Sequence, residues 1–267
     1  MKILVTGHKG YIGSHLYKDL ANLEHEVIGI DLKDGQDLAH CLPDEEFDYV
    51  FHLAALPSVQ FSVENPSYTM RHNVLSTSIL LEWALKHKIK RVIFSSSAAA
   101  ADVNSPYGMH KRMNEMECKL YSQLYNLDTV CLRYFNVYSE DQPYGGAYST
   151  AISAWMEAAR NGLPMRIDGD GEQTRDFIHV SDVLNANVFC MQSSYDFSGK
   201  IMNVGTGTSV SLNNIKDFLE RRGFTNWLRT PTRPGDVRHS SADTTELQNI
   251  GWEAEVDITE GLKKCFL

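Results

Sequence analysis

The chain has 267 residues, 43% of them hydrophobic, and its 34 acidic and 25 Lys and Arg side chains give a formal net charge of −9. This length allows one substantial core or two closely packed domains, and the acidic balance without a basic cluster argues against nucleic acid as a partner. The five cysteines lack metal-ligand spacing, and no signal peptide or apolar run of membrane length appears. We therefore expect no metal, no membrane partner and a reducing, cytoplasmic location.

A glycine-rich turn follows the first expected strand. Residues 2–6 contain a short apolar run typical of a buried parallel strand, and Gly7, Gly10 and Gly13 then open a predicted helix. This spacing lets the backbone approach a pyrophosphate that faces the positive end of the helix.

A second expected strand, residues 26–30, ends at Asp31. A carboxylate at this position suits the hydroxyls of an adenosine ribose and repels a 2′-phosphate, so the pattern favours NAD over NADP, with a turn residue as the other interpretation. Asp37 and Leu38 lie only a few residues after Asp31, so the elements that usually separate these positions are shortened. Asp37 is placed to reach the adenine amino group, although a solvated loop acid is nearly as good an interpretation.

Two further strands and a helix lead towards the centre of the chain. A strand over residues 48–55 ends in the small residues that a backbone beside a dinucleotide requires, and residues 67–88 form a long helix that is apolar on several faces. The next strand, residues 91–94, leads into the serine triplet 95–97. Ligands in open α/β sheets bind at such carboxyl ends.

Ser105 and Pro106 are typical of a helix start, and Tyr107 and Lys111 lie one turn apart on that helix. A nearby ammonium and the positive ring of an oxidised nicotinamide both favour the phenolate of a tyrosine. Ser97 can hydrogen-bond to the same substrate hydroxyl. The order of these residues indicates a hydride-transfer site of the short-chain dehydrogenase kind.

The same helix has two contrasting faces. One carries Tyr107, Lys111, Asn114, Cys118 and Tyr125. The opposite face carries Met109, Met113, Met116, Leu120 and Leu124. This second face is either a further layer of core or, together with residues 67–88, the interface of a homodimer.

Several motifs together resemble the extended short-chain dehydrogenase/reductase family, and within it the nucleotide-sugar epimerases and dehydratases. They are the glycine turn 6–13, Leu53-Ala54-Ala55, the serine triplet, residues 105–111, 133–138, 169–180 and 233–243. The resemblance implies an α/β fold with a Rossmann-type doubly wound parallel sheet and a smaller C-terminal substrate-binding lobe. It also implies an NAD-binding domain over residues 1–137 and a mainly substrate-binding lobe over 138–267, with the chain returning to the first domain around 176–206.

The resemblance implies roles for individual residues. Ser97, Tyr107 and Lys111 are implied as catalytic, with Tyr107 the base at the sugar C4 hydroxyl. The implied NAD-binding residues are Gly7, Gly10, Tyr11, Ile12, Gly13, Asp31, Asp37, Leu38, Leu53, Ala54, Ala55, Asn73, Tyr107, Lys111, Tyr134 and Phe135. The implied nucleotide-sugar residues are Ser97, Asn136, Arg175, Arg233 and Asp236. Two guanidinium groups suit a diphosphate, and a carboxylate suits a ribose diol; a structural ion pair is the other interpretation of Arg175 with Asp176.

Three positions depart from the family pattern. Residues 98–104 are shorter than the usual stretch, so part of the wall over the sugar is expected to be missing. Asp168 stands where an aromatic residue often packs near the base. Ser240 is small at a position that restricts the sugar, and is expected to tolerate an N-acetylated hexose.

The best functional interpretation is an NAD-dependent 4-epimerase of UDP-glucose/galactose or the N-acetylated hexoses, working through a transient 4-keto intermediate. A 4,6-dehydratase is the first alternative, but Ala98 and Ala99 stand where its acid and base are expected. A reductase is the second, and Asp31 disfavours the NADP that it would more often use. A non-catalytic NAD-binding protein is the third.

Overall fold

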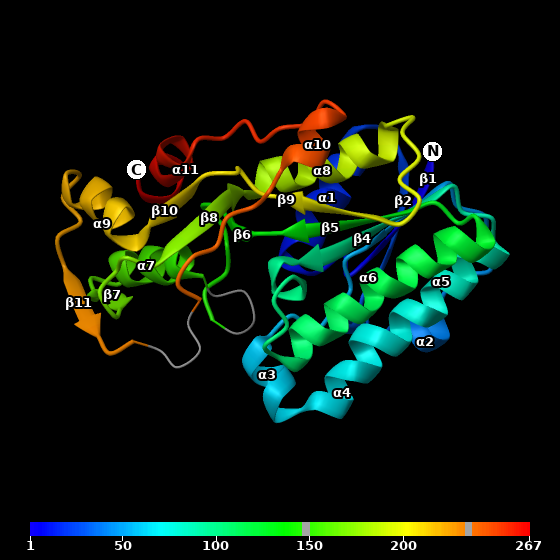
Figure 1. Ribbon diagram of the computed structural model, residues 1–267, viewed down its shortest axis with the longest axis horizontal. Coiled ribbons are helices and arrows are strands. Elements are labelled where there is room, and N and C mark those ends of the chain that lie inside the picture. Colours follow the sequence, from blue (N-terminus) through cyan, green and yellow to red (C-terminus); the bar gives the residue numbers. More distant parts are fainter. Residues whose placement is uncertain (146–149, 233–236) are drawn as a thin grey trace. The chain divides into compact units, whose positions relative to one another are not determined.

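The computed structural model describes residues 1–145, 150–232 and 237–267. The chain divides into two compact units (Figure 1). The first comprises Met1–Tyr134 and Leu184–Asn203, and the second Phe135–Val183 and Val204–Leu267.

A six-stranded sheet forms the centre of the first unit, in the order β2-β1-β3-β4-β5-β9. The strands are β1 (Lys2–Thr6), β2 (Glu26–Ile30), β3 (Tyr49–His52), β4 (Arg91–Ser97), β5 (Thr129–Tyr134) and β9 (Lys200–Val204). β1 pairs in parallel with β2 and β3, β3 with β4, and β4 with β5. The chain order reverses beside β1, so the carboxyl ends of β1 and β3 flank a topological switch point, as the Rossmann-type prediction requires.

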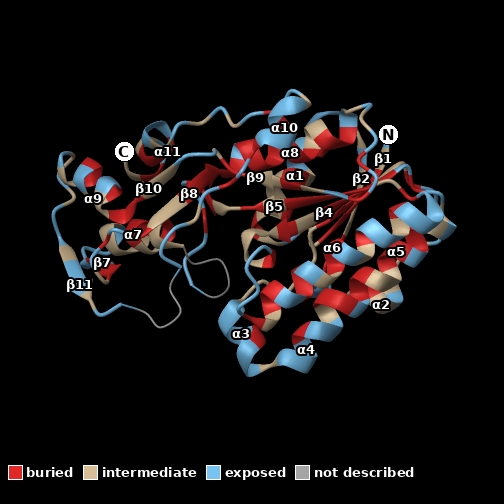
Figure 2. Cartoon of the chain, in the orientation of Figure 1, coloured by how far each residue is buried: buried red, intermediate tan, exposed pale blue. Residues whose placement is uncertain are grey.

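Helices cover both faces of this sheet. α1 (Tyr11–Asn22) and α8 (Val180–Gln192) lie on one face, and α5 (Ser76–Lys86) and α6 (Pro106–Tyr125) on the other (Figure 1). Leu4, Val50 and Val92 from the strands share a buried cluster with Leu80 and Leu81 of α5. Figure 2 shows the central strands β1, β3, β4 and β5 as almost continuously buried, which is why they lack polar alternation.

Short helical segments connect these elements. They are η1 (Leu32–Asp34), α2 (Leu38–Cys41), α3 (Val59–Glu64), α4 (Pro66–Met70), η2 (Arg71–Leu75) and η3 (Ala98–Ala100). The helix expected over residues 67–88 is present as α4, η2 and α5 in succession, and η2 is a π-helix. β3 ends before the expected residue 55, although Leu53 N still donates to Thr6 O at 3.1 Å.

α6 begins as predicted. The Ser105 side chain accepts a hydrogen bond from Gly108 N, and Pro106 takes the first helical position. Lys111 is only 2% exposed, whereas Met116 on the opposite face is 64% exposed. Tyr125, which the periodicity assigns to the same face as Lys111, lies in the last turn, where its ring packs on Tyr121 and remains 50% exposed.

The second unit has its own sheets and core. Its strands are β6 (Asn136–Tyr138), β7 (Met165–Asp168), β8 (Thr174–His179), β10 (Ser209–Ser211) and β11 (Trp227–Thr230). Its helices are α7 (Ala151–Arg160), α9 (Leu212–Glu220), α10 (Thr245–Asn249) and α11 (Ile258–Phe266). β8 lies between β10 and β6, and β7 pairs in parallel with β11. Trp155, Phe177 and Leu219 belong to one buried cluster that joins α7, β8 and α9. Within the described ranges, no helix has the length and apolarity needed to cross a membrane.

Candidate active site

The turn between β1 and α1 has no room for side chains at two of its glycines. Gly7 has φ +75°, and a Cβ there would lie 2.7 Å from Ala54 N. A Cβ on Gly13 would lie 2.1 Å from Gly7 O. α1 begins after Gly10, and no side chain caps it. The positive end of the helix therefore meets a close-packed backbone turn, which fits a pyrophosphate.

Asp31 is buried at the end of β2 and holds two backbone segments together. Its Oδ2 accepts from Lys9 N in the glycine turn, and its Oδ1 accepts from Lys33 N, both at 2.8 Å. A carboxylate has about four lone-pair sites, so these two bonds leave capacity for ribose hydroxyls. The geometry of Asp31 therefore fits both of its interpretations, a ribose-binding carboxylate and a turn residue.

Asp37 has structural contacts of its own. One carboxylate oxygen caps α2 by accepting from Ala39 N at 3.1 Å, and the other lies 3.8 Å from Arg71 Nη2. The adjacent Leu38 is buried in the core of the first unit. These contacts place the Asp37 carboxylate between α2 and η2.

Asn73 braces the backbone that follows β3. The side chain is 1% exposed, its Oδ1 accepts from Leu56 N at 2.7 Å, and its Nδ2 donates to Leu56 O at 3.1 Å. Leu53, Ala54 and Ala55 lie immediately before this anchor and beside the glycine turn. Asn73 thus acts on this loop through a hydrogen-bonded backbone pair.

A buried histidine connects the same parts. His52 Nδ1 lies 2.7 Å from Thr6 Oγ1, and His52 Nε2 lies 2.9 Å from Thr77 Oγ1. Thr6 Oγ1 accepts from Ala54 N, and Thr77 Oγ1 donates to Asn73 O. These directions assign a neutral imidazole with its proton on Nε2. Burial, and to a lesser extent the charge of Lys111, lowers the pKa of His52 to about 3.

Tyr107 and Lys111 are buried together on α6. Lys111 Nζ donates to Ser95 O at 2.6 Å and lies 6.0 Å from the centre of the Tyr107 ring. Burial lowers the pKa of Lys111 to about 8. Ser97 Oγ accepts from Ala99 N at 3.2 Å, so the hydroxyl retains its own proton for donation.

Glu115 holds α6 against the strands that carry the serines. It is fully buried, accepts from Ser96 Oγ at 2.6 Å, and forms a two-pronged ion pair with Arg133 on β5 at 2.7 and 2.8 Å. Its charge acts against burial and raises the pKa of Lys111. Glu115 therefore supports the charge of Lys111, and its bonds to Ser96 and Arg133 hold α6 in place.

The short segment after Ser97 packs directly on α6. η3 lies so close that a Cβ on Gly108 would be 2.5 Å from Ala99 O. Residues 101–104, which complete the connection to Ser105, are all exposed. Position 108 therefore requires glycine, because the short connection packs η3 directly against this part of α6.

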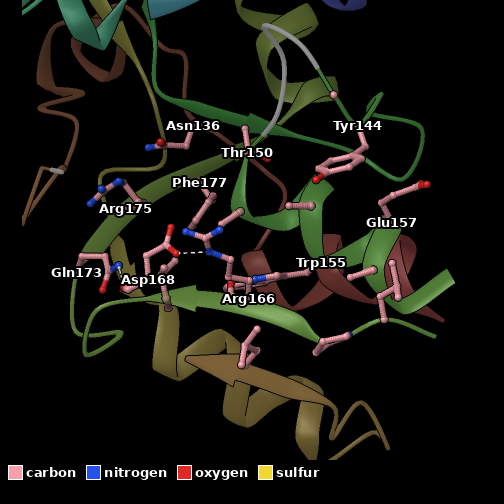
Figure 3. A pocket seen from close by; sticks show the side chains of 18 residues that line it. Asn136, Tyr144, Thr150, Trp155, Glu157, Arg166, Asp168, Gln173, Arg175 and Phe177 are labelled. Atoms are coloured by element: carbon pink, nitrogen blue, oxygen red, sulfur yellow. Dashed lines mark hydrogen bonds and ion pairs between the residues drawn. The ribbon is translucent and has the colours of Figure 1, made fainter. Parts of the chain in front are cut away.

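The second unit contains a cavity of about 760 Å³ (Figure 3). Its polar lining includes Asn136, Arg166, Asp168, Gln173 and Arg175, and its apolar lining includes Trp155, Leu163, Pro164 and Leu228. A cavity with several convergent polar groups and an apolar portion is typical of a small-molecule site.

The polar side chains of this cavity are held by bonds within the second unit. Arg166 Nε donates to Asp168 Oδ1 at 2.5 Å, the dashed contact in Figure 3. Arg175 Nη1 donates to Thr174 O at 2.8 Å, and Asn136 Nδ2 donates to Asp176 O at 2.8 Å.

The Asp176 carboxylate is engaged elsewhere, which disfavours an ion pair with Arg175. Its Oδ1 accepts from Thr206 N and Thr206 Oγ1, and its Oδ2 accepts from Gly207 N and Ala242 N. Four donors satisfy both oxygens of this fully buried group. Asp176 therefore organises the loop after β9, and Arg175 lines the cavity.

Residues 3–205 match the family model described as the NAD dependent epimerase/dehydratase family. The chain belongs to this family. A putative UDP-glucose 4-epimerase of Methanocaldococcus jannaschii is 34% identical over 300 aligned positions, which cover 98% of this chain and 96% of that protein.

Two solved structures have a similar fold. A UDP-N-acetylglucosamine 4-epimerase from Methanobrevibacter ruminantium, in complex with UDP-N-acetylmuramic acid, has a TM-score of 0.90 at 32% identity and covers 99% and 96% of the two chains. MoeE5 in complex with UDP-glucose and NAD has a TM-score of 0.86 at 32% identity and covers 99% and 97%.

The remaining predicted site residues of this epimerase/dehydratase chain are distributed over both units. Tyr11 is buried and Ile12 half-buried in the first turn of α1, and Tyr134 OH donates to Asn187 Oδ1 on α8 at 2.9 Å. Phe135 opens the second unit. Arg233 and Asp236 lie outside the described residues.

Sequence reasoning missed His52, Arg166 and Trp155. His52 lies in the apolar sequence of β3, and no periodic pattern there indicates that its side chain joins a polar network. Arg166 and Trp155 meet only because α7 and β7 fold against each other, as the bond from Trp155 Nε1 to Arg166 O shows. A charged residue in the short strand 165–168 was the available signal for Arg166.

Proposed function

We propose that this protein is an NAD-dependent nucleotide-sugar 4-epimerase acting on UDP-glucose/galactose or the corresponding N-acetylhexosamines. The observation that carries the proposal is the buried pair Tyr107 and Lys111, one turn apart on α6, with Lys111 bonded to Ser95 in the strand β4 that ends at Ser97. The family match and the UDP-sugar 4-epimerases among its relatives support the reaction class.

The first unit is the proposed NAD-binding part. Gly7, Gly10 and Gly13 fit the pyrophosphate, Asp31 the adenosine ribose, and the braced loop 53–55 a neighbouring stretch of the dinucleotide. NAD, when bound, supplies the hydride acceptor, and afterwards the hydride donor, at C4 of the sugar.

Tyr107 is the proposed proton carrier. Its phenolate accepts the proton of the C4 hydroxyl and later returns a proton to the same oxygen, so no net proton is consumed. The buried Lys111 ammonium favours the phenolate, and Ser97 donates a hydrogen bond to the sugar oxygen.

The cavity of the second unit is the proposed nucleotide site. Arg175 and Asn136, predicted from the sequence, line it together with Arg166 and Asp168. Guanidinium groups suit a diphosphate, and the apolar wall with Trp155 suits a base. Arg233 and Asp236 are proposed to complete the clamp on sequence grounds.

Purified protein incubated with UDP-glucose, UDP-galactose and their N-acetyl derivatives, without added cofactor, tests the proposal by NMR of the products. We expect interconversion of C4 epimers, and none with Tyr107→Phe. A stable 4-keto-6-deoxy product would indicate a dehydratase, and NADPH-dependent reduction a reductase. If the protein releases NAD on denaturation but converts none of these sugars, the result would favour a non-catalytic NAD-binding protein.

We also propose a homodimer in the cytoplasm. Met109, Met116, Leu120 and Leu124 form an exposed apolar stripe on α6, and large exposed apolar stripes on a monomer are an aggregation liability. All five cysteines are free, which is consistent with a reducing compartment.

A further inference from the structure

The catalytic helix α6 is tied to the helical run 58–77 at two points. Near its start, Tyr107 N donates to Ser62 Oγ of α3 at 3.1 Å. Two turns further on, Asn114 Nδ2 donates to Asn73 O of η2 at 2.7 Å. Tyr107 and Lys111 lie on the stretch between these two bonds.

Ser62 is oriented for this contact. The side chain is fully buried, and its hydroxyl proton is donated to Val59 O at 2.6 Å, so the oxygen presents a lone pair to Tyr107 N. The first turn of α6 is thereby satisfied without water: Pro106 has no N–H, and Gly108 N donates to Ser105 Oγ. Ser62 is the only one of these acceptors that belongs to another helix.

Asn114 is buried at a cost to the fold. It is 1% exposed, and its Oδ1 has no hydrogen-bond partner among the described residues. An unpartnered buried acceptor is destabilising, and Asn73 O already accepts from Thr77 Oγ1. An apolar side chain at position 114 would therefore be more favourable for folding. Stability does not explain the Asn114 amide, so its bond to Asn73 needs a functional explanation.

We propose that Ser62 and Asn114 are positioning residues that fix α6 lengthwise against the run 58–77. Because Lys111 Nζ is also held by Ser95 O on β4, a lengthwise shift of α6 would move the Tyr107 hydroxyl relative to the Lys111 ammonium. Asn73 extends this frame, because the same residue that receives Asn114 also holds Leu56, two residues after Ala54, which lies beside the glycine turn. The frame relates the base to the loop that is proposed to lie along the dinucleotide. This inference rests on the proposed roles of Tyr107 and Lys111.

Three variants test the inference. Ser62→Ala and Asn114→Leu each remove one tie, and Ser76→Ala is the matched control. Ser76 is a buried serine of the same run, and within the described residues its hydroxyl bonds only to His72 O, one turn earlier. We expect kcat to fall at least about tenfold in Ser62→Ala and Asn114→Leu with KM within about twofold, since small displacements of a catalytic group are costly. Asn114→Leu should show this loss with an unchanged or higher melting temperature. Equal losses of kcat in Ser62→Ala and Ser76→Ala would overturn the proposal.

A second readout does not need turnover. The phenol of Tyr107 is titrated by ultraviolet difference spectroscopy, with Tyr107→Phe in the same background as the reference. We expect Tyr107 to ionise at higher pH in Ser62→Ala than in the unmodified protein or Ser76→Ala, because the phenolate is then less well placed beside Lys111. Identical titrations would refute the positioning role. A shifted titration in a protein that epimerises no sugar would refute the proposed function and leave the positioning role intact.

Discussion

Lys111 Nζ donates to the carbonyl oxygen of Ser95 at 2.6 Å, and this bond holds a buried ammonium against the end of β4. The same burial lowers its pKa to about 8. The fold therefore keeps a cation where desolvation disfavours one, which is typical of a group retained for function.

Replacement of Lys111 by Met should separate stability from activity. The pKa of Lys111 falls from 10.5 to about 8 on folding, so the charged form is disfavoured in the folded state by up to about 3 kcal/mol. At pH 7 we expect Lys111→Met to lose epimerase activity and to gain free energy of unfolding, measured by urea denaturation. The gain should shrink between pH 8 and 10.5, because only the unfolded unmodified protein still binds the proton there.

His52 should make the fold acid-sensitive. Its pKa drops to about 3 in the folded state, so the unfolded state binds more protons below pH 6.5. This single group should lower the free energy of unfolding by about 1.4 kcal/mol for each pH unit between 6.5 and the folded pKa. We expect His52→Asn to be less stable at pH 7 but to show a shallower decline from pH 6 to 4. Equal slopes for His52→Asn and the unmodified protein would contradict the buried neutral imidazole.

Asp31 should decide the cofactor. Its carboxylate sits between the glycine turn and η1, where a 2′-phosphate would meet a negative charge. Chromatography of the nucleotide released on denaturation should recover NAD from the unmodified protein and less of it from Asp31→Asn. Recovery of mostly NADP from the unmodified protein would show that the assignment is wrong.

The sequence predicts the first unit well wherever a single short motif determines the local structure. Ser105 and Pro106 fix the start of α6, and the glycine turn fixes the approach of β1 to Ala54. The π-helix η2 was not predictable, because a change of hydrogen-bond register leaves the apolar pattern of a helix almost unchanged. The tie between Ser62 and Tyr107 likewise joins residues 45 positions apart through a side chain and a backbone amide.

The cavity of the second unit is the part of the site least visible in the sequence. Its lining includes residues of β6, α7, β7, β8, α9 and β11, and no single stretch contains enough of it to form a motif. Asp168 departs from the family pattern, and its buried carboxylate is satisfied because Arg166 Nε and Thr230 Oγ1 both donate to Oδ1.

Arg166 should contribute to nucleotide affinity. Its Nε is engaged by Asp168 and Thr230, and its side chain lines the cavity with 55% exposure. We expect Arg166→Met to weaken UDP binding by about tenfold in calorimetry, the effect of losing about 1.4 kcal/mol, with kcat little changed. Arg229→Met is the control, because Arg229 is an exposed arginine of the neighbouring β11 that bonds to Asn213 and Gly169 and does not line the cavity. Equal UDP affinity in Arg166→Met and Arg229→Met would remove Arg166 from the nucleotide site.

The exposed stripe of α6 should govern assembly. Met116 is 64% exposed and Leu120 is 49% exposed, whereas Lys111 is buried. Two helices from each of two copies, α5 and α6, would bury such stripes about a two-fold axis, the commonest oligomeric symmetry. We expect the unmodified protein to sediment as a dimer and the double variant Met116→Glu, Leu120→Glu as a monomer or an insoluble protein. Leu23→Glu, at an equally exposed leucine after α1, should remain dimeric. A monomeric unmodified protein at micromolar concentration would show that the stripe is simply exposed surface.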